Sequence, residues 1–586
     1  MVFLLLCGNL LLAQTEKDST KTSIAKRAFE EGLNLITRTP SDTVKNEEND
    51  DRFQEYTGKI IRNIYVESAG FEVSIYGTEK KIVQKIGKIA NKLHTNTREK
   101  TIRQHLFVKP NQQVNPYKLG DNERYLRNQD FILESRIIVT PVDGTDSVDL
   151  TVVTRDVFSI GARAGGSFPT APELQVYDAN LDGRGQRLQA DLLFDVDRTP
   201  KFGFGVLYSK SSLLGTLTDL EVAYSQLNTG IGFGDETEYS TSLKLERPLV
   251  SPYSKLAGGL ELSHNWSKNV FNKPDSSYLD YRYNVFNIWT GYNLGTDKDV
   301  QDRRREFIAL RYFDGNFVST PDQEDYVRKN RYSSQKGILA EFTLYQKNYF
   351  KTQYVYGFGR TEDQPYGYSV AISSGYIRSA GSNRPYSAIK LNYSKVKGKG
   401  GFYSANLNMG GYFNNRKFED VVIQSDFRYF TPAYSLGRYK LRTGVNLAYS
   451  QVFFRRFEDW MEINSTYISG LRVDILEAKQ RTSSEIEARL FTPWAIAGFR
   501  MAPFASIQAA RLYCGSCERK NNRYYGLSAG LRTRNENLIF GTMELKFTFI
   551  PSDDQGDNKF VIRFRQNLRI RDDREFVQAP SLIRYN

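Results

Sequence analysis

The sequence predicts a mainly β protein, in which a small α+β domain precedes a transmembrane antiparallel β-barrel. From about residue 157 onward, segment after segment alternates apolar and polar residues at period two, which is the period of a β-strand. The 586 residues include 37 Tyr and 37 Phe, yet the mean hydropathy is only −0.51. Beyond the N-terminus we find no run of ~18 apolar residues, which argues against membrane-spanning helices. A barrel escapes that test because its apolar residues occupy alternate positions.

The N-terminal region predicts export from the cytoplasm. Residues 2–13 form a short apolar core that ends in small and polar residues, as in a secretory signal peptide over residues 1–14. Cys7 follows Leu6 rather than a small residue, so a lipid anchor at Cys7 is the less favoured alternative. Residues 15–57 are polar and acidic, and we expect them to form a linker or tether with one helix at 23–38.

Residues 58–156 predict the α+β domain. A strand at 58–68 precedes helices at 97–108 and 115–132, and a hairpin then turns at Asp143 and Gly144. A further amphipathic stretch covers residues 78–96. The order strand, helix, helix, strand, strand is typical of a small domain with its own core.

Residues 157–586 predict the barrel. They contain roughly eighteen to twenty candidate strands, and longer polar connections alternate with tighter ones. A soluble sandwich is the alternative, but an array of this length would show domain breaks and would expose few aromatic residues. Here aromatic residues recur near strand ends, as in "YFTPAYS" and "LFTPWAIAGF", which is typical of the girdles at a membrane interface. Closure of the sheet would also remove the edges at which so many apolar strands would aggregate.

The stretch "KFVIRFRQNLRI", residues 559–570, shows what such a barrel requires of its two faces. Aromatic and aliphatic residues occupy one set of alternate positions, and Arg563, Arg565 and Arg569 fall in the other. An arginine on the lipid side costs roughly 2–4 kcal/mol at the membrane midplane. We therefore expect Arg563, Arg565 and Arg569 to face an aqueous lumen.

The sequence offers no constellation that indicates catalysis or cofactor binding. His94, His105 and His264 are isolated, and neither a phosphate loop nor a nucleophile elbow is present. Cys514 and Cys517 form a lone CxxC between strand-like segments, which leaves a loop disulfide or two free thiols open. We expect no enzyme activity and no cofactor. The net charge of +13 favours anionic neighbours such as outer-membrane lipids or lipopolysaccharide, but its even spread does not suggest nucleic-acid binding.

Three stretches resemble a known family. Residues 101–156, which begin "TIRQHLFVKP", resemble a polypeptide-transport-associated (POTRA) domain. The turn "YDANLDGRGQRL" resembles the second barrel turn of the BamA-type superfamily of bacterial surface antigens, and "GLRTRNENLIFGTMELKFTFIP" resembles its last hairpins. The residues of the turn that match are Asp178, Asn180, Leu181, Gly183 and Gly185. The likeness covers residues 58–586.

This resemblance implies a barrel of sixteen strands or more in the outer membrane of a Gram-negative bacterium, with the POTRA domain in the periplasm. It implies assembly, insertion or translocation of outer-membrane proteins, through seam opening and strand templating rather than bond chemistry. The POTRA domain of such proteins offers a strand edge to client β-barrel polypeptides by β-augmentation. Accessory envelope proteins are further expected partners. Only one POTRA-like domain is visible, which implies a reduced role in handling clients.

The superfamily also carries an Arg-Gly-Phe/Tyr tripeptide in a long loop folded into the lumen, where the arginine pairs with acidic groups on the wall. Arg472 matches this arginine, but Val473 and Asp474 replace the other two residues. Glu487 matches an acidic wall position, whereas Gln508 stands where the group usually has Asp. Because a buried guanidinium needs a paired acceptor, the resemblance implies a weakened or replaced lock. A solvated loop arginine is the alternative for Arg472.

Two other functions stay open from the sequence alone. A diffusion channel or transporter with a basic lumen would use Arg563, Arg565 and Arg569, and a large, steady, anion-preferring conductance would reveal it. A structural subunit of an envelope complex would instead be recovered with stable, stoichiometric partners.

Overall fold

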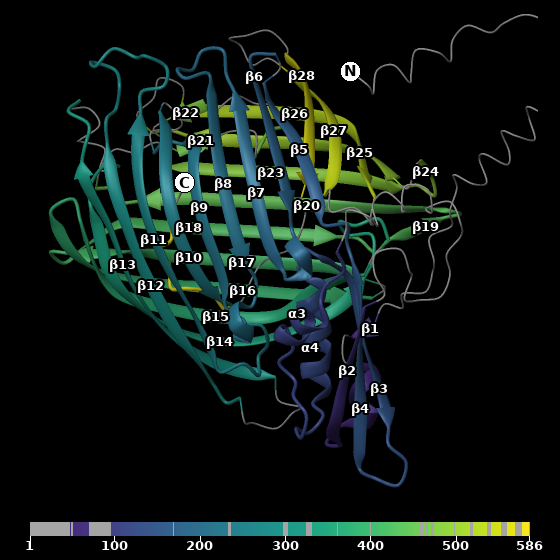
Figure 1. Ribbon diagram of the computed structural model, residues 1–586. Coiled ribbons are helices and arrows are strands. Elements are labelled where there is room, and N and C mark those ends of the chain that lie inside the picture. The colour runs from purple at the N-terminus through teal and green to yellow at the C-terminus, as the bar shows by residue number, and fades with distance from the viewer. Residues whose placement is uncertain are drawn as a thin grey trace, which may run out of the picture.

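In the computed structural model of the protein, a large antiparallel barrel stands on a small α+β unit (Figure 1). The structure describes residues 47–48, 51–68, 95–167, 169–231, 236–296, 303–323, 331–359, 361–398, 400–456, 461–463, 467–469, 474–476, 478–496, 499–515, 520–535, 541–551, 559–568 and 577–584. Several sequence predictions fall outside these residues. They are the signal peptide with Cys7, the helix at 23–38, most of the amphipathic stretch at 78–96, and residues Arg472, Cys517 and Arg569.

The α+β unit contains the expected elements between residues 58 and 156. They are β2 (Ile60–Ser68), α3 (Glu99–Gln104), α4 (Pro116–Arg127), β3 (Ile132–Pro141) and β4 (Ser147–Asp156). The three strands form one sheet in the order β2, β4, β3, with β2 parallel and β3 antiparallel to β4. Ahead of them lie the two-residue strand β1 (Glu47–Glu48) and the 3-10 helix η1 (Asp51–Tyr56).

The core of this unit lies between the sheet and its helices. Ile61, Leu119 and Leu150 are fully buried there, and each contributes about 1.5–3 kcal/mol by leaving water. Phe53 of η1 is 1% exposed in the same core, and β1 pairs with strand β14 (Gln335–Thr352) of the barrel. The predicted tether at 15–57 was therefore wrong at its end, because η1 belongs to the folded unit.

The barrel strands follow one another along the chain. They are β5 (Ile160–Ser167), β6 (Ala171–Asp178), β7 (Gln186–Phe194), β8 (Phe202–Lys210), β9 (Asp219–Thr229), β10 (Thr237–Arg247), β11 (Leu256–Lys268), β12 (Arg282–Leu294), β13 (Arg304–Ser319), β14 (Gln335–Thr352), β15 (Glu362–Ser379), β16 (Ser382–Lys397), β17 (Gly401–Asn414), β18 (Lys417–Phe430), β20 (Tyr439–Phe453), β23 (Gln480–Phe491), β25 (Phe499–Tyr513), β26 (Asn521–Arg534), β27 (Thr542–Ile550) and β28 (Lys559–Leu568). The short elements among them are η3 (Leu181–Gly183), η4 (Leu213–Gly215), β19 (Tyr434–Leu436), β21 (Met461–Ile463), β22 (Asp474–Leu476) and β24 (Ala495–Ile496).

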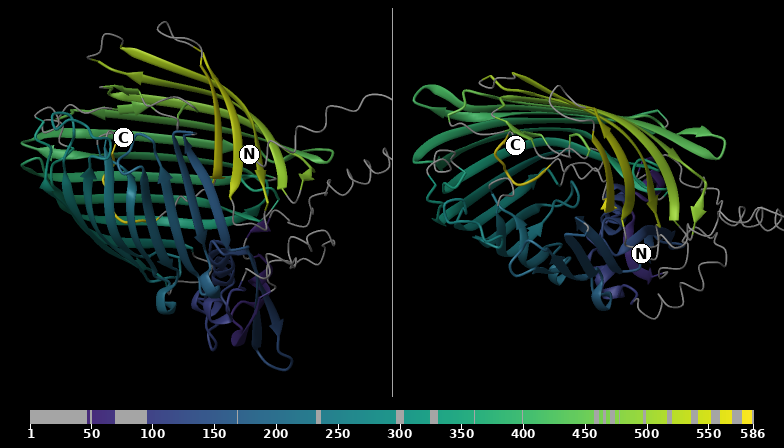
Figure 2. Two further views of the ribbon diagram at one scale, coloured as in Figure 1. Left: turned by 45° about the horizontal axis from the view of Figure 1, so that its top comes forward. Right: turned by 90° about the horizontal axis from the view of Figure 1, so that it is seen from above.

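The sheet returns on itself. Each long barrel strand pairs antiparallel with the next, and β28 lies beside β5, so within the described part of the chain 20 long strands form a nearly closed ring (Figure 2). The resemblance implies sixteen strands or more, and the observed number lies above sixteen and within the range of eighteen to twenty candidates. The α+β unit lies at one end of the ring, below β5 and its neighbours (Figure 1).

Strand β13 shows how the two faces differ. Ile308 and Leu310 are 50% and 48% exposed on the outer face, whereas Phe307 and Ala309 are each 1% exposed on the inner face. In water an outer face of this kind, repeated on strand after strand, would be a large aggregation-prone surface. Facing lipid, it is solvated by hydrocarbon. This alternation supports the transmembrane barrel and argues against the soluble sandwich.

Three smaller findings complete the description. Within the described ranges, no helix has the length and apolar character needed to cross a membrane. Among these same residues, no group of three His, Cys, Asp or Glu side chains could hold a metal ion. Cys514 is disulfide-bonded, which decides between the two states predicted for it.

Candidate functional site

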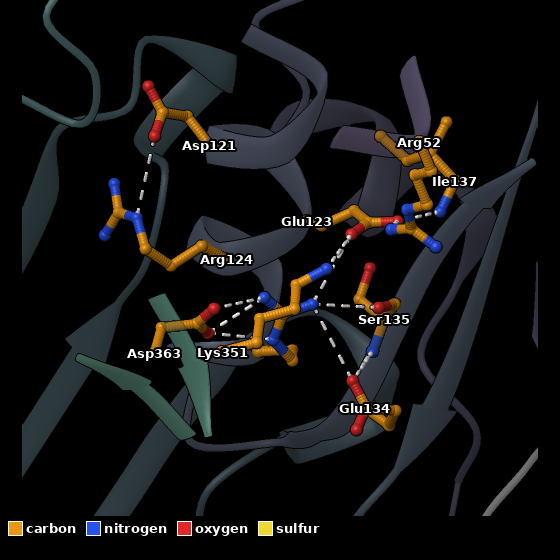
Figure 3. A network of polar contacts seen from close by, with 10 residues as sticks. Arg52, Asp121, Glu123, Arg124, Glu134, Ser135, Ile137, Lys351 and Asp363 are labelled. Carbon is orange, nitrogen blue, oxygen red and sulfur yellow. Dashed lines mark hydrogen bonds and ion pairs between the residues drawn. The ribbon is translucent and has the colours of Figure 1, made fainter. Parts of the chain in front are cut away.

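The first candidate site is the junction between helix α4 and the rim of the barrel (Figure 3). Asn115 caps the helix, because its side chain accepts hydrogen bonds from the backbone nitrogens of Tyr117 and Lys118, and Pro116 occupies the first turn. The helix is packed between its own sheet and the barrel, so its polar face is buried. The polar and charged residues buried on it are Asp121, Asn122, Glu123, Arg124 and Arg127.

Arg127 joins the α+β unit to strand β15. Its guanidinium donates to both carboxylate oxygens of Asp363, with an Nη2 to Oδ1 distance of 2.8 Å and an Nε to Oδ2 distance of 3.0 Å. Glu123 and Glu134 lie 3.6 Å and 3.7 Å from Nη1. Burial alone lowers the pKa of Arg127, but Asp363, Glu134 and Glu123 outweigh burial, so its pKa is raised and the side chain stays charged.

Glu123, whose side chain is fully buried, joins the same unit to strand β14. It pairs with Lys351 at 3.4 Å and with Arg52 of η1. One of its oxygens also accepts the backbone N–H of Ile137 on β3, and Arg127 donates to the carbonyl of Ser135 on the same strand at 3.1 Å. The two charged side chains that dock the unit therefore also form hydrogen bonds with backbone groups of β3.

The other side of α4 contacts the connection between β10 and β11. Arg124 donates to the carbonyl of Val250 at 2.6 Å and lies 4.0 Å from the ring centroid of Tyr349. Asp121 accepts from the hydroxyl of Ser251 at 2.6 Å, and Tyr117 stacks on the ring of Tyr253. A buried charge network of this kind gives orientation more than stability, because desolvation offsets much of the attraction.

The second candidate site is the turn between β6 and β7, where the sequence motif lies. Asp178 accepts the backbone N–H of Asn180 at 2.9 Å. Asn180 is 1% exposed, donates to Thr97 at 2.8 Å, and accepts the N–H of Gly185 at 2.7 Å. The motif thus closes its own turn and holds the segment that leads into α3.

Gly183 lets the two parts approach each other. Its φ is +67°, and a Cβ built there would lie 2.3 Å from the carbonyl oxygen of Asn96. The carbonyl of Gly183 accepts from the backbone N–H of Arg98 and the hydroxyl of Thr101, both at 2.9 Å. A glycine is required here by both the backbone conformation and the contact.

His105 lies at the end of α3 against the next turn of the barrel. Its Nδ1 donates to the carbonyl of Thr101 at 2.7 Å, and its Nε2 lies 3.1 Å from the hydroxyl oxygen of Ser211. Burial lowers the pKa of His105 to about 4, against the hydrogen bond that it donates to the carbonyl of Thr101, which raises the pKa. The ring is therefore neutral near pH 7 and is buried at the junction.

The third candidate site is on the inner wall, where the resemblance placed a lock. Glu487 is 6% exposed and pairs with Arg532 through two hydrogen bonds of 2.7 and 2.8 Å. Arg489 also bonds Glu487, and Arg532 extends the pair to Glu544 at 2.8 Å. Both partners of Glu487 come from wall strands. Contact with Arg472 lies outside the described residues.

Gln508 holds a different part of the same loop. Its amide nitrogen donates to Glu485 at 2.8 Å, and its amide oxygen accepts the backbone N–H of Ser469 at 2.9 Å. Ile468 is fully buried against Ala510 and Leu512 of β25. Gln508 therefore binds the loop backbone from the position where the resemblance implied an acidic residue.

The basic residues of β28 lie on the inner side of that strand. Phe560, Ile562 and Phe564 are 81%, 69% and 56% exposed, while Arg563 and Arg565 are half-buried on the opposite face. The neighbouring Gln566 donates to the carbonyl of Ala162 on β5 at 2.8 Å, and its amide oxygen lies 3.4 Å from the nitrogen of Ala164. These contacts bridge the first and last strands of the barrel.

The charges of α4 were not singled out from the sequence. Asp121 and Arg124 are three residues apart, and Glu123 and Arg127 are four apart, which is the spacing of ordinary surface pairs on a helix. A usable signal was their density. In the stretch "GDNERYLR" most of the polar residues are charged. Such a density of charges suits a helix that packs against other elements on two sides.

Comparisons with known proteins add little to this geometry. No protein-family model and no curated protein matches the sequence. Among solved structures, BamA from Haemophilus ducreyi lacking POTRA domains 1–3 is similar at 11% identity, over 95% of this chain and 94% of that one, with a TM-score of 0.33. CdiB from Acinetobacter baumannii is similar at 12% identity, over 94% and 99%, with a TM-score of 0.42.

The FrpB iron transporter from Neisseria meningitidis is similar at 7% identity, over 91% of this chain and 90% of that one, with a TM-score of 0.36. At these scores the likenesses do not discriminate between functions, and the architecture rests on the strand topology itself.

Proposed function

We propose that this protein is a barrel of the bacterial outer membrane that assembles, inserts or translocates outer-membrane proteins, with its α+β unit in the periplasm. The observation that carries the proposal is the position of that unit. β4 ends at Asp156 and β5 begins at Ile160, so the unit leads directly into a seam strand of the barrel. The charge network of α4 and the turn motif at residues 178–185 then fix it against the rim.

The seam supports an opening step. β5 has 8 residues and β28 has 10, whereas β14 and β15 pair over 18 residues each. Among the neighbouring long barrel strands that the structure describes, β5 and β28 share the smallest contact. Each backbone hydrogen bond contributes a net of about 0.5–1.5 kcal/mol, so this pair costs the least to separate. The side chain of Gln566 bridges this pair and would be released with it.

A client strand requires a sheet edge, and β3 is one of the two edge strands of the unit, the other being β2. Glu123 and Arg127 occupy the backbone of Ile137 and Ser135 on that strand. Client binding by β-augmentation would therefore compete with the contacts that dock the unit to β14 and β15. In this proposal, the unit moves away from the rim when it takes a client.

The inner wall argues against the channel alternative. Arg532 pairs with Glu487 and Glu544, and Lys390 pairs with Glu341 at 2.9 Å. These two inward cations are neutralised by carboxylates, whereas an anion-selective lumen needs uncompensated positive charge. Arg563 and Arg565, on which the channel alternative depends, are not members of these pairs. In this proposal, the net charge of +13 attracts anionic lipids or lipopolysaccharide outside the lumen.

Depletion of the protein in its own host tests the proposal. We expect the levels of other barrel proteins in the outer membrane to fall, and expression of the wild-type chain to restore them. Unchanged levels after complete depletion would contradict an assembly role. A large, steady, anion-preferring conductance of the purified protein in planar bilayers would instead support the channel.

A further inference from the structure

Residues 577–584 lie inside the barrel rather than in its wall. In Figure 2 this short yellow segment runs within the ring of strands. It is separated by eight residues from the end of β28 and forms no strand of its own. The segment crosses the inner wall from β12 and β13 to β18. The sequence predicted barrel for this whole region, so its position was not foreseen.

Apolar side chains pack the beginning and the end of the segment against the wall. Val577 is 7% exposed and packs in a cluster with Trp289 and Phe307. Leu582 and Ile583 pack against a second cluster of buried wall residues. That cluster comprises Phe313, Leu339, Ile377, Tyr386 and Ala388.

Wall side chains also bind the backbone of the segment. Arg311 donates to the carbonyl of Pro580 at 2.8 Å, and Gln424 donates to the carbonyl of Arg584. The backbone N–H of Ile583 donates to the hydroxyl oxygen of Tyr386 at 2.8 Å. Recognition of backbone groups by a pre-formed wall is how proteins hold extended peptides.

One side-chain contact and one close approach add selectivity. Lys390 donates to the hydroxyl of Ser581 at 3.0 Å while it remains paired with Glu341. A Cβ built at Gly410 would lie 3.1 Å from Cδ1 of Ile583 and 2.5 Å from the hydroxyl of Tyr386. The wall therefore has a small residue where the segment and its tyrosine anchor come closest.

We propose that the inner wall formed by β12 to β18 is a binding site for extended peptides, which residues 577–584 occupy in cis. The site selects a small hydroxyl residue followed by two aliphatic residues and accepts the flanking backbone with little regard to sequence. A cavity of about 260 Å³ beside the segment, lined in part by Asn392, Asn406 and Asn408, leaves room for larger side chains. This site does not depend on the function proposed above, since a peptide would bind it in a translocating barrel or in a channel.

The test uses the full chain and a released variant, Leu582→Asp/Ile583→Asp, with Gln578→Ser as the matched control. Gln578 is an exposed residue of the same segment. A fluorescent synthetic peptide of residues 577–586 is titrated into each protein in detergent, beside a scrambled peptide of the same composition. Because a tethered segment has an effective concentration in the mM range, a peptide with a Kd near 10 μM should bind the released variant roughly 100-fold more tightly than the wild type.

Saturable binding to the released variant, with much weaker binding to the wild type and to Gln578→Ser, supports the proposal. Arg311→Met in the released background should then weaken the peptide by about tenfold, because it removes a charged donor to a carbonyl. If the two aspartates prevent folding, judged by heat-modifiable gel mobility, a chain that ends at Phe576 replaces the variant. Absence of binding to a folded, released barrel, or equal binding of the scrambled peptide, overturns the proposal.

Discussion

The contact between Arg127 and Asp363 should control whether the α+β unit stays on the barrel. The perturbation is Asp363→Asn, which keeps the size of the side chain and removes its charge. The two side chains are only 6% and 9% exposed, so the guanidinium would lose a buried partner. Removal of one member of a buried pair costs about 3–5 kcal/mol. Glu123 and Glu134 stay within 4 Å of the same guanidinium, so we expect the lower end, ~3 kcal/mol, or roughly a 100-fold shift in the docking equilibrium.

Hydrogen–deuterium exchange measures this shift at α4 and β3, where the N–H of Ile137 is bonded to Glu123. The design is a double-mutant cycle with Arg127→Met, Asp363→Asn and the double variant, which isolates the pairwise coupling. The matched control is Arg62 with Asp149, an ion pair in the same unit whose arginine is half exposed. We expect only a weak coupling there, because solvent screens an exposed pair. Exchange at β3 that stays at the wild-type rate, or a coupling no larger than that of the control, would refute the reasoning.

Three further predictions concern single residues. Asn180→Ala should lower the free energy of unfolding by about 1–3 kcal/mol, measured by urea titration, since it leaves the N–H of Gly185 and the hydroxyl of Thr97 without this buried partner. The pKa of His105 is about 4 in the folded chain, against an ordinary value of 6.5. Its contribution to the free energy of unfolding is therefore fully present above about pH 6.5, and about 3 kcal/mol of it is lost as the pH falls toward 4. His105→Gln should remove that pH dependence of thermal unfolding. Glu487→Gln should cost about 3–5 kcal/mol and lower the temperature at which the barrel unfolds on a gel, because Arg489 and Arg532 lose a shared carboxylate.

The fold was predictable because its signals are local. Period two along each strand and the apolar face of each helix report burial directly, and Leu119, Leu126 and Ile61 lie in the core as that pattern implies. The same periodicity predicts roughly eighteen to twenty strands, a range that includes the observed 20, but it does not fix the number. The resemblance implies only a lower value of sixteen, because strand number is set by how far the sheet curves before it closes, and no short motif encodes that.

The sites were less predictable because they depend on pairs that are distant in sequence. Arg127 and Asp363 are 236 residues apart, and each has ordinary sequence neighbours. The motif at 178–185 was visible as a motif, but its contact with Thr97 and Asn96 appears only when α3 is placed beside it. Residues 577–584 contain no strand pattern, and their polar partners lie on strands far upstream in the chain.

The junction and the inner wall share one structural element, the connection at 353–361 between β14 and β15. Lys351 and Asp363, which hold the α+β unit, flank this connection. Within it, the carbonyl of Val355 accepts from Arg489, and Arg489 bonds Glu487. A change at the junction therefore has a contiguous path to the pair of Glu487 and Arg532. Contiguity alone does not establish coupling, because packed contacts can absorb a displacement. The coupling free energy between Asp363→Asn and Glu487→Gln decides whether the two sites are coupled. It is nonzero only if a displacement at Asp363 is carried through the connection to Glu487.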